Sequence, residues 1–256
     1  MTAVQRTISP VDERVYAERP YATPADSERT LTLAVKAQRA WKTTPVAERA
    51  RIANAFATAF EKRRDAIAGE ITWQMGRPLA AAPGEVRGTL ERARHMAAIA
   101  EESLADVDAG PKAGFRRFVR REPLGVVLTI AAWNYPYLIA VNSVVPAILA
   151  GNAVILKHSA QTPLCAERFA ECFEEAGLPQ GVYQYLHMTH ADTERVIGDP
   201  RIAFVAFTGS VAGGHSVQHA AADRFIATGL ELGGNDPAYV RADAHFAHAV
   251  ENLVDG

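Results

Sequence analysis

The sequence predicts an α/β protein, with an N-terminal helical segment packed on a doubly wound, mostly parallel Rossmann-like sheet. Before about residue 110, apolar residues recur at the three- and four-residue spacing of amphipathic helices. From about residue 123, short apolar and β-branched runs alternate with helical segments. Hydrophobic residues make up 48% of the 256 and charged residues 22%, a globular composition that excludes disorder as the main state.

Three amphipathic helices are expected in the first part of the chain, at 31–41, 46–71 and 84–104. Turn-forming residues separate them, at 43–45 and again at 75–78, where the sequence is Met-Gly-Arg-Pro. A stretch with two glycines and a proline at 109–114 ends the helical segment.

The second half of the chain predicts a strand-and-helix alternation. The expected strands are 125–132, 153–157, 183–187, 202–207 and 225–232, and the expected helices are 136–149, 163–176, 191–197, 210–222 and 243–254. Near-continuous apolar strands joined by helical crossovers are typical of a parallel sheet that is buried on both faces. Ligands of such sheets bind beyond the carboxyl ends of the strands.

The carboxyl end of the first expected strand carries Trp133 and Asn134. The Asn134 amide could donate to a developing oxyanion, a contact whose removal costs about 3 to 4 kcal/mol elsewhere. An asparagine helix cap beside a packed tryptophan would give the same pattern, because Pro136 fits a first helical position.

Two further strand ends offer groups that suit a phosphate. Lys157 ends the second strand and could neutralise a phosphate or bond ribose hydroxyls, although such a lysine can also simply return the chain to solvent. The fourth strand is followed by Gly209, Ser210 and Gly214 at a strand-to-helix turn, where backbone N–H groups can meet a pyrophosphate. The spacing is not the strict dinucleotide fingerprint.

The fifth strand ends in Glu231, which lies between two leucines and precedes Gly233 and Gly234. A carboxyl group in apolar surroundings becomes a better general base. A structural glutamate in an ion pair would give the same sequence pattern.

Several other function classes are not favoured. His215 and His219 are four residues apart, but HSVQH lacks the glutamate of the zinc-protease motif, so no metal site is expected. Cys165 and Cys172 are too few for a disulfide framework and fit small buried hydrophobes rather than nucleophiles.

The sequence also favours a cytoplasmic location without a membrane partner. The first ten residues lack the apolar core of a secretory signal, and polar residues interrupt the longest apolar stretch, 138–156. Four arginines between 116 and 121 could contact nucleic acid, with salt-dependent binding. An exposed strand explains them more simply, and no nucleic-acid partner is expected.

Four motifs, in this order, resemble those of the aldehyde dehydrogenase superfamily: AAWNYPY (131–137), ILKHSAQTP (155–163), FTGS with Gly214 (207–214) and LELGGNDP (230–237). The resemblance runs from about residue 8 to the C-terminus, and His158 with the Asn-Asp-Pro is similar to the succinate-semialdehyde dehydrogenase branch. It implies oxidation of an aldehyde, a semialdehyde being one candidate, to a carboxylic acid with NAD(P)+. In that chemistry a cysteine thiolate attacks the carbonyl, hydride passes to the nicotinamide, and water hydrolyses the thioester.

The resemblance also implies roles for individual residues. Asn134 would be the side-chain donor of the oxyanion hole, and Glu231 the base that activates water. Trp133, Gly209 and Ser210 would line the pyrophosphate, with Lys157 at the adenosine ribose. The implied cofactor-binding set is Ile130, Ala132, Trp133, Lys157, Ser159, Ala160, Gly209, Ser210, Gly214, Leu232 and Gly233.

Ala160 stands where the family has a glutamate that grips both ribose hydroxyls and repels a 2′-phosphate. We therefore expect NADP+ to be accepted at least as well as NAD+.

The resemblance implies three parts: a helical part of the cofactor-binding domain (1–114), an oligomerisation-type strand (115–122) and a Rossmann-like NAD(P)-binding domain (123–256). The family's nucleophilic cysteine lies farther C-terminal than the 25 residues after Glu231, so the catalytic domain is expected to be absent. We expect a truncated fragment that is inactive alone, and a homo-oligomer when complete. The alternative is a non-catalytic nucleotide-binding or interaction module derived from the family.

Overall fold

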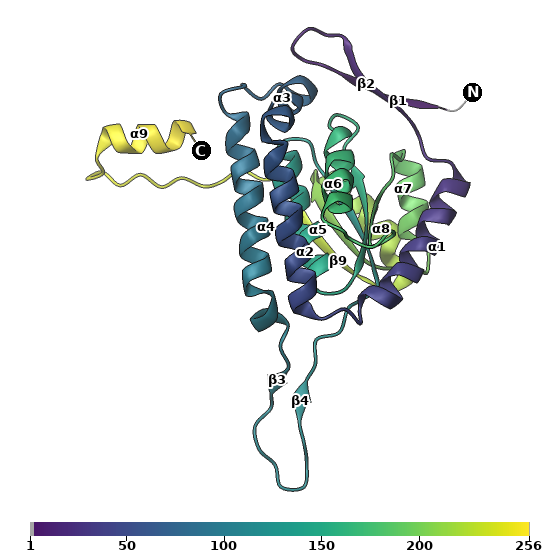
Figure 1. Cartoon of the computed structure of the whole chain (residues 1–256). Coiled ribbons are helices and arrows are strands. Elements are labelled where there is room, and N and C mark those ends of the chain that lie inside the picture. Colours follow the sequence, from purple (N-terminus) through teal and green to yellow (C-terminus); the bar gives the residue numbers. More distant parts are fainter. Residues whose placement is uncertain (1–2, 256) are drawn as a thin grey trace.

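The computed structural model describes residues 3–255, which form a hairpin, a group of long helices and a parallel sheet (Figure 1). The N-terminal elements are β1 (Val4–Ile8), β2 (Val15–Pro20), α1 (Pro24–Trp41), α2 (Val46–Lys62), α3 (Arg64–Met75) and α4 (Ala82–Leu104). Two short strands, β3 (Val107–Asp108) and β4 (Phe118–Val119), then pair in a second hairpin.

The second half alternates strands and helices as predicted. Its strands are β5 (Val126–Ala131), β6 (Ala153–His158), β7 (Tyr183–Tyr185), β8 (Ile202–Gly209) and β9 (Ala227–Leu232). Its helices are α5 (Pro136–Leu149), α6 (Leu164–Glu175), α7 (His190–Ile197), α8 (Val211–Ala221), the short η1 (Ala222–Arg224) and α9 (Phe246–Asp255). The five strands are parallel, in the order β7-β6-β5-β8-β9, which confirms the predicted doubly wound α/β fold.

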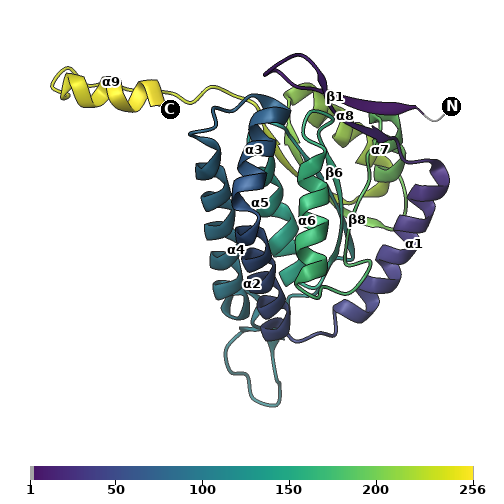
Figure 2. The same ribbon diagram turned by 45° about the horizontal axis from the view of Figure 1, so that its top comes forward.

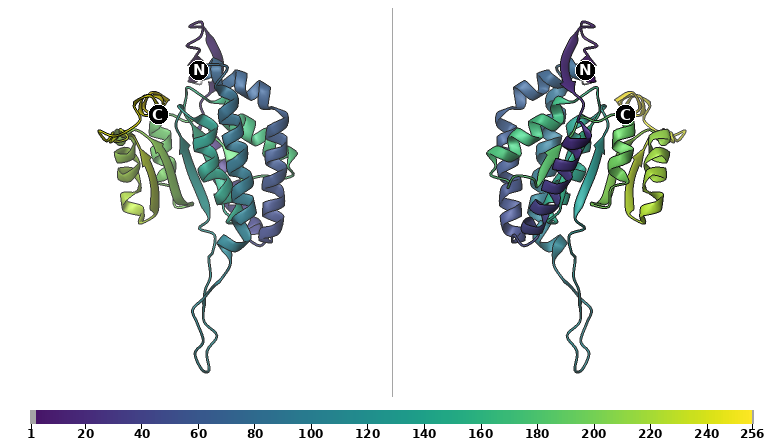
Figure 3. Two further views of the ribbon diagram at one scale, coloured as in Figure 1. Left: turned by 90° about the vertical axis from the view of Figure 1, so that its left-hand side faces the viewer. Right: turned by 90° about the vertical axis from the view of Figure 1, so that its right-hand side faces the viewer.

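Helices cover the two faces of the sheet because successive strand residues point in opposite directions. In β5, Val127 and Ala131 join the core formed with α2, α4, α5 and α6. Their neighbours Val126, Leu128 and Ile130 join a second core formed with α1, α7 and α8. Figure 3 shows these helix layers on either side of the strands.

An aromatic cluster joins the N-terminal helices to the sheet layer. Phe56 of α2 stacks on Phe173 of α6 with ring centroids 4.1 Å apart, and meets Phe169 edge-on at 5.2 Å. The Trp41 indole N–H donates to the carbonyl of Ile148 at 2.9 Å, which ties the end of α1 to the end of α5. The helical segment therefore shares one core with the sheet.

The prediction of a single helix over 46–71 was wrong, because the chain turns at Arg63 between α2 and α3. Lys62 Nζ and Arg63 Nη1 there contact the Glu175 carboxylate on α6 at 2.7 and 2.6 Å. Apolar spacing alone does not mark such a break.

The hairpin of β1 and β2 was not predicted. Long-range contacts hold it against the sheet layer: Thr7 Oγ1 donates to the Ala160 carbonyl at 2.8 Å, and Arg19 Nε pairs with Glu167 at 2.7 Å. Helix α1 also begins earlier than expected, at a capping box of Thr23 and Asp26.

The strand predicted at 115–122 is limited to Phe118–Val119 and pairs with β3 in a narrow arm that projects from the body (Figure 1). Several arginines of the arm form hydrogen bonds or ion pairs within it. Arg117 Nη2 donates to the carbonyls of Ala109 and Gly110 at 2.9 Å, and Arg120 pairs with Asp106. These contacts give the arginine cluster a local structural role.

Helix α9 lies apart from the body of the molecule at the end of an extended segment (Figures 1 and 2). Its apolar residues Phe246, Val250, Leu253 and Val254 are exposed. Over the described range 3–255, no helix combines the length and the apolar character needed to cross a membrane.

We predict that Phe56→Ala lowers the free energy of unfolding by about 3 to 5 kcal/mol, because it empties the centre of the aromatic cluster. The measurement is urea unfolding followed by far-UV circular dichroism. Phe115→Ala is the matched control, since Phe115 lies on the arm with 67% of its surface exposed. Equal losses for the two variants would contradict the assignment of the core.

Candidate functional site

A cleft of about 360 Å³ lies at the carboxyl edge of the sheet, between the ends of β5, β6 and β8 and the first turns of α7 and α8. Seven residues predicted as cofactor-binding line it: Ile130, Ala132, Trp133, Lys157, Ser159, Gly209 and Ser210. The structure therefore brings together side chains and backbone from three separate strand ends.

Lys157 is the main charged group of this cleft. Lys157 of β6 pairs with Ile130 of β5 in the parallel sheet, and only 7% of the residue is exposed. Burial lowers the pKa of the Lys157 ammonium. Within residues 3–255 this ammonium has neither a hydrogen bond nor an ion pair, so it does not simply return the chain to solvent. The ammonium nitrogen keeps some contact with solvent in the cleft, and a largely buried cation of this kind favours a ligand that brings negative charge or hydroxyl acceptors.

The first turn of α8 forms another wall of the cleft. Ser210 is the N-cap, and its Oγ accepts the N–H of Gly213 at 3.1 Å. A Cβ on either Gly209 or Gly213 would lie 2.6 Å from Phe207 Cζ, so the packing of that ring excludes larger residues at both positions. Free N–H groups at a helix N-terminus suit an anionic ligand.

Four predicted cofactor-binding residues lie outside the cleft lining: Ala160, Gly214, Leu232 and Gly233. Gly214 is buried under Leu232, whose Cδ2 would be 2.7 Å from an added Cβ, so it is a packing position. Ala160 is exposed, and its carbonyl accepts the Thr7 hydroxyl. In their place the cleft is lined by Gly213 and Ser216 of α8.

The contribution of α7 was not predicted: His190, Thr193 and Glu194 of this helix line the cleft. The Thr189 side chain accepts the N–H of Asp192 at 3.1 Å, and this cap is visible in the sequence as the start of a helix. The cap alone does not show which face of α7 points toward the cleft.

A second cavity of about 680 Å³ lies on the other side of the loop 132–135. Its lining includes the predicted residues Ala132, Trp133, Asn134, Gly209, Ser210, Glu231, Leu232 and Gly233. Trp133 therefore contacts both spaces. The N-cap of α5 is Tyr135 and has no side-chain cap, so Asn134 does not cap the helix. Among the described residues its amide has no hydrogen-bond partner.

The expectation that Glu231 lies in apolar surroundings is wrong, because this residue is exposed. It belongs to β9, which forms the edge of the sheet, and the neighbouring Leu232 is itself 42% exposed. No ion pair holds Glu231 within the described part of the chain. Alternation along a strand does not reveal whether that strand lies at an edge.

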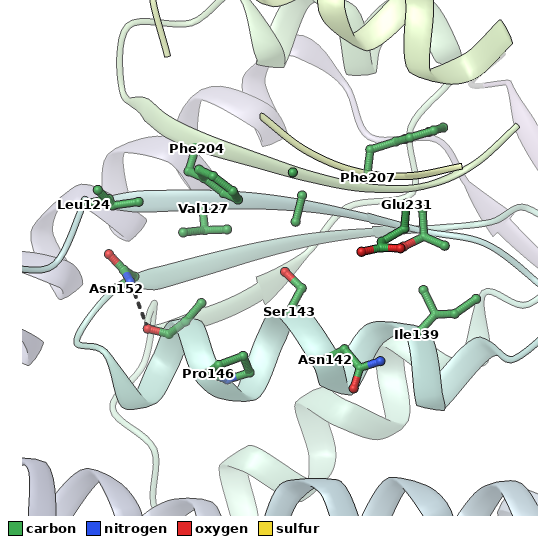
Figure 4. Close-up of a pocket in the computed structure, with 14 residues that line it drawn as sticks. Leu124, Val127, Ile139, Asn142, Ser143, Pro146, Asn152, Phe204, Phe207 and Glu231 are labelled. Atoms are coloured by element: carbon green, nitrogen blue, oxygen red, sulfur yellow. Dashed lines mark hydrogen bonds between the residues drawn. The ribbon is translucent and has the colours of Figure 1, made fainter. Parts of the chain in front are cut away.

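Glu231 also borders an open groove of about 610 Å³ between α5 and the strands β8 and β9. Figure 4 shows its two walls, formed by Ile139, Asn142, Ser143 and Pro146 on α5, and by Phe204, Phe207 and Glu231 on the strands. The groove and the second cavity share Ile139, Asn142, Thr208 and Glu231, so they are neighbouring spaces on one face of the sheet.

His158 fixes the end of β6 against the start of α5. Its Nε2 lies 3.0 Å from the Pro136 carbonyl and its Nδ1 lies 3.0 Å from Thr162 Oγ1. The Pro136 carbonyl can only accept, so Nε2 carries a hydrogen, and the Thr162 hydroxyl can donate to Nδ1 of a neutral ring. Burial lowers the pKa of His158 to about 4.

Both cysteines lie on α6 in the core and are buried. Burial raises the pKa of the Cys165 thiol and raises that of Cys172 to about 12. They are protonated at neutral pH, as expected for small buried hydrophobes. In the described part of the chain, no three histidine, cysteine or acidic side chains gather closely enough to hold a metal ion.

Comparison with known proteins gives consistent matches. The sequence profile of the aldehyde dehydrogenase family matches residues 2–256. Succinate-semialdehyde dehydrogenase (NADP+) of Mycobacterium avium (strain 104) is 39% identical over 213 residues, which cover 82% of this chain and 45% of that protein. Succinate-semialdehyde dehydrogenase (NADP+) 1 of Mycobacterium tuberculosis (strain ATCC 25618 / H37Rv) is 35% identical over 252 residues, covering 98% and 55% respectively.

A solved structure of succinic semialdehyde dehydrogenase from Streptococcus pyogenes, in complex with NADP+, superimposes with a TM-score of 0.92 at 28% sequence identity. The match covers 96% of this chain and 54% of that one. The chain thus spans about half the length of the curated relatives it matches.

We predict that acidification destabilises the fold through His158. The unfolded residue takes up a proton near its ordinary pKa of 6.5, whereas the folded one does so only near 4, so stability falls as pH falls through this window. The loss from this residue is at most about 3 kcal/mol. The free energy of unfolding of His158→Gln, measured in urea from pH 7 to pH 4, is expected to fall less steeply than that of the wild type. Parallel profiles would contradict this account, and His219→Gln, at an exposed position, is the control.

Proposed function

Because this chain belongs to the aldehyde dehydrogenase family, we propose that it forms the NAD(P)-binding part of an enzyme that oxidises an aldehyde to a carboxylic acid. The observation that carries the proposal is the cleft at the carboxyl edge, where the buried, unpartnered Lys157 and the N-terminus of α8 face one space. A dinucleotide offers both phosphates and ribose hydroxyls, which are the groups this lining can bind.

The residues of the cleft divide by chemistry. Lys157 would bind the adenosine ribose or a phosphate on it, while the N–H groups after Ser210 would face the pyrophosphate. Bound NAD(P)+ supplies the hydride acceptor of the reaction. Trp133 separates this cleft from the second cavity and would contact both cofactor and substrate.

The second cavity would hold the aldehyde. Asn134 has an amide without a described partner, and we assign it the donor role toward the developing oxyanion. Glu231 reaches the same cavity, and we assign it the role of the base that activates water. Its exposure leaves its carboxylate accessible to water, which that role requires.

We also propose that the 256 residues alone do not oxidise aldehydes. The reaction needs a thiolate, and both cysteines of the chain are buried in the α6 core with raised pKa values. Neither lies in the lining of the cleft or of the second cavity. The nucleophile would have to come from residues outside this chain.

A semialdehyde is the substrate we favour, because the curated relatives carry that name. The solved structure from Streptococcus pyogenes that superimposes on this chain is also a succinic semialdehyde dehydrogenase.

The remaining assignments follow from the same family comparison. We propose that 1–114 and 123–256 together form the cofactor-binding unit and that the arm around 115–122 pairs with other subunits in a homo-oligomer. Phe115, Phe118 and Val119 are exposed on this arm, which supports such pairing. The two free thiols favour a reducing, cytoplasmic location.

We predict that the chain binds NADP+ at least as tightly as NAD+, measured by isothermal titration calorimetry. Lys157→Met should weaken binding of NADP+ by about tenfold or more, equivalent to about 1.4 kcal/mol. Ala160→Glu should weaken NADP+ selectively through repulsion of the 2′-phosphate. Lys112→Met, on the exposed arm, is the matched control and should change nothing. An NAD+ preference above about a hundredfold, or unchanged binding by Lys157→Met, would contradict the proposal.

We predict that neither thiol of the native chain reacts with 5,5′-dithiobis(2-nitrobenzoate) until urea unfolds it, and that the chain with NADP+ and succinic semialdehyde produces no NADPH. Rapid labelling of a native thiol together with turnover would contradict the assignment. A non-catalytic module would instead bind the nucleotide but produce no NADPH, even when a polypeptide that carries the family's catalytic domain is added.

A further inference from the structure

The turn at 75–78 was predicted only as a break between helices, yet Arg77 in this turn reaches the loop 132–135. Gly76 makes the turn possible, since it ends α3 in the left-handed region with φ of 83°. Arg77 pairs with Glu85 of α4, and neither residue lines the cleft or the second cavity.

Glu85 caps α5 from a different helix. Its side chain is fully buried, and its Oε1 accepts the N–H of Tyr137 at 2.9 Å and that of Leu138 at 3.4 Å. These N–H groups belong to the first turn of α5, where the N-cap residue Tyr135 offers no side-chain acceptor. The Glu85 carboxylate therefore satisfies helix N–H groups that would otherwise have none of the usual local partners.

Arg77 connects this cap to the loop. Its Nη1 donates to Glu85 Oε2 at 2.6 Å, and its Nη2 donates to the carbonyl of Asn134 at 2.7 Å. Its guanidinium carbon also lies 4.0 Å from the centre of the Tyr135 ring. One planar group thus holds the cap, the backbone of Asn134 and the ring of Tyr135 in a single arrangement.

We propose that Arg77 and Glu85 are a positioning pair, which fixes the loop 132–135 so that Trp133 and Asn134 face the cleft and the second cavity. The inference rests on the function proposed above. The pair touches neither cofactor nor substrate and acts through the backbone that it holds.

Charge makes the arrangement sensitive to substitution. Burial raises the pKa of Glu85, while Arg77 and the two backbone N–H groups oppose that shift. Removal of Arg77 leaves a buried carboxylate without its counter-charge, a state that proteins avoid. Arg77→Lys keeps the charge, but one compact ammonium cannot reproduce the two guanidinium nitrogens, which donate in different directions.

The test uses the full chain with Arg77→Lys, Arg77→Met and Glu85→Gln. Three quantities are measured for each variant: the NMR signal of the Trp133 indole N–H, the dissociation constant of NADP+ and the midpoint of urea unfolding. The Trp133 signal is assigned by its loss in Trp133→Phe. Arg168→Met is the matched control, because Arg168 pairs with Glu70 and Glu171 rather than with the loop.

We expect Arg77→Lys to shift or broaden the Trp133 signal and to raise the dissociation constant about tenfold, with a urea midpoint close to that of the wild type. Arg168→Met should lower the midpoint without altering the Trp133 signal. If Arg77→Lys and Arg77→Met leave the Trp133 signal and NADP+ binding unchanged, the positioning role is overturned and the proposed function stands.

If the wild type binds no dinucleotide, the proposed function fails instead. The Trp133 signal still decides the positioning of the loop, because it is measured without ligand. A changed signal in Arg77→Lys supports the pair, and an unchanged signal overturns it. If Glu85→Gln does not fold, the two Arg77 variants carry the test.

Discussion

The parallel register of β5, β6 and β8 is the constraint on which the rest of this structure depends. Ile130 lies beside Lys157 on one side and beside Phe207 on the other, so three chain segments end at the same level. Helices cover both faces of these strands, so a charged side chain near a strand end reaches open space only at the carboxyl edge of the sheet. The buried position of Lys157 is therefore a consequence of strand pairing, and so is the cleft that its ammonium faces.

The same register separates two groups of polar residues, which line neighbouring spaces. On one side of Trp133 lie the Lys157 ammonium and the start of α8, which both suit negative charge. On the other side lie the neutral amide of Asn134 and the exposed carboxylate of Glu231. In the function proposed above, anion binding and carbonyl chemistry would therefore occupy adjacent spaces that share one loop. The loop itself is hydrogen-bonded by Arg77, in the turn between α3 and α4, which gives the N-terminal helical segment a part in the site.

The sequence predicted the features that repeat along the chain and missed those that depend on distant contacts. Apolar strands and the turn after Phe207 identified the sheet and seven residues of the cleft lining, because strand ends in a parallel sheet share an edge. The hairpin at 4–20 depends on partners such as Ala160 and Glu167, far away in sequence. The exposure of Glu231 depends on strand order, and the cap of α5 by Glu85 crosses 52 residues. Local pattern carries no information on these contacts.

We infer that a dinucleotide binds in the cleft beside Lys157 and the N-terminus of α8. Hydrogen–deuterium exchange of the full chain, with and without saturating NADP+, tests it most directly. We expect slower amide exchange at 131–134 and 209–214 when NADP+ is bound, and no change along the arm at 105–123. Protection confined to the arm, or no protection at either strand end, would contradict it.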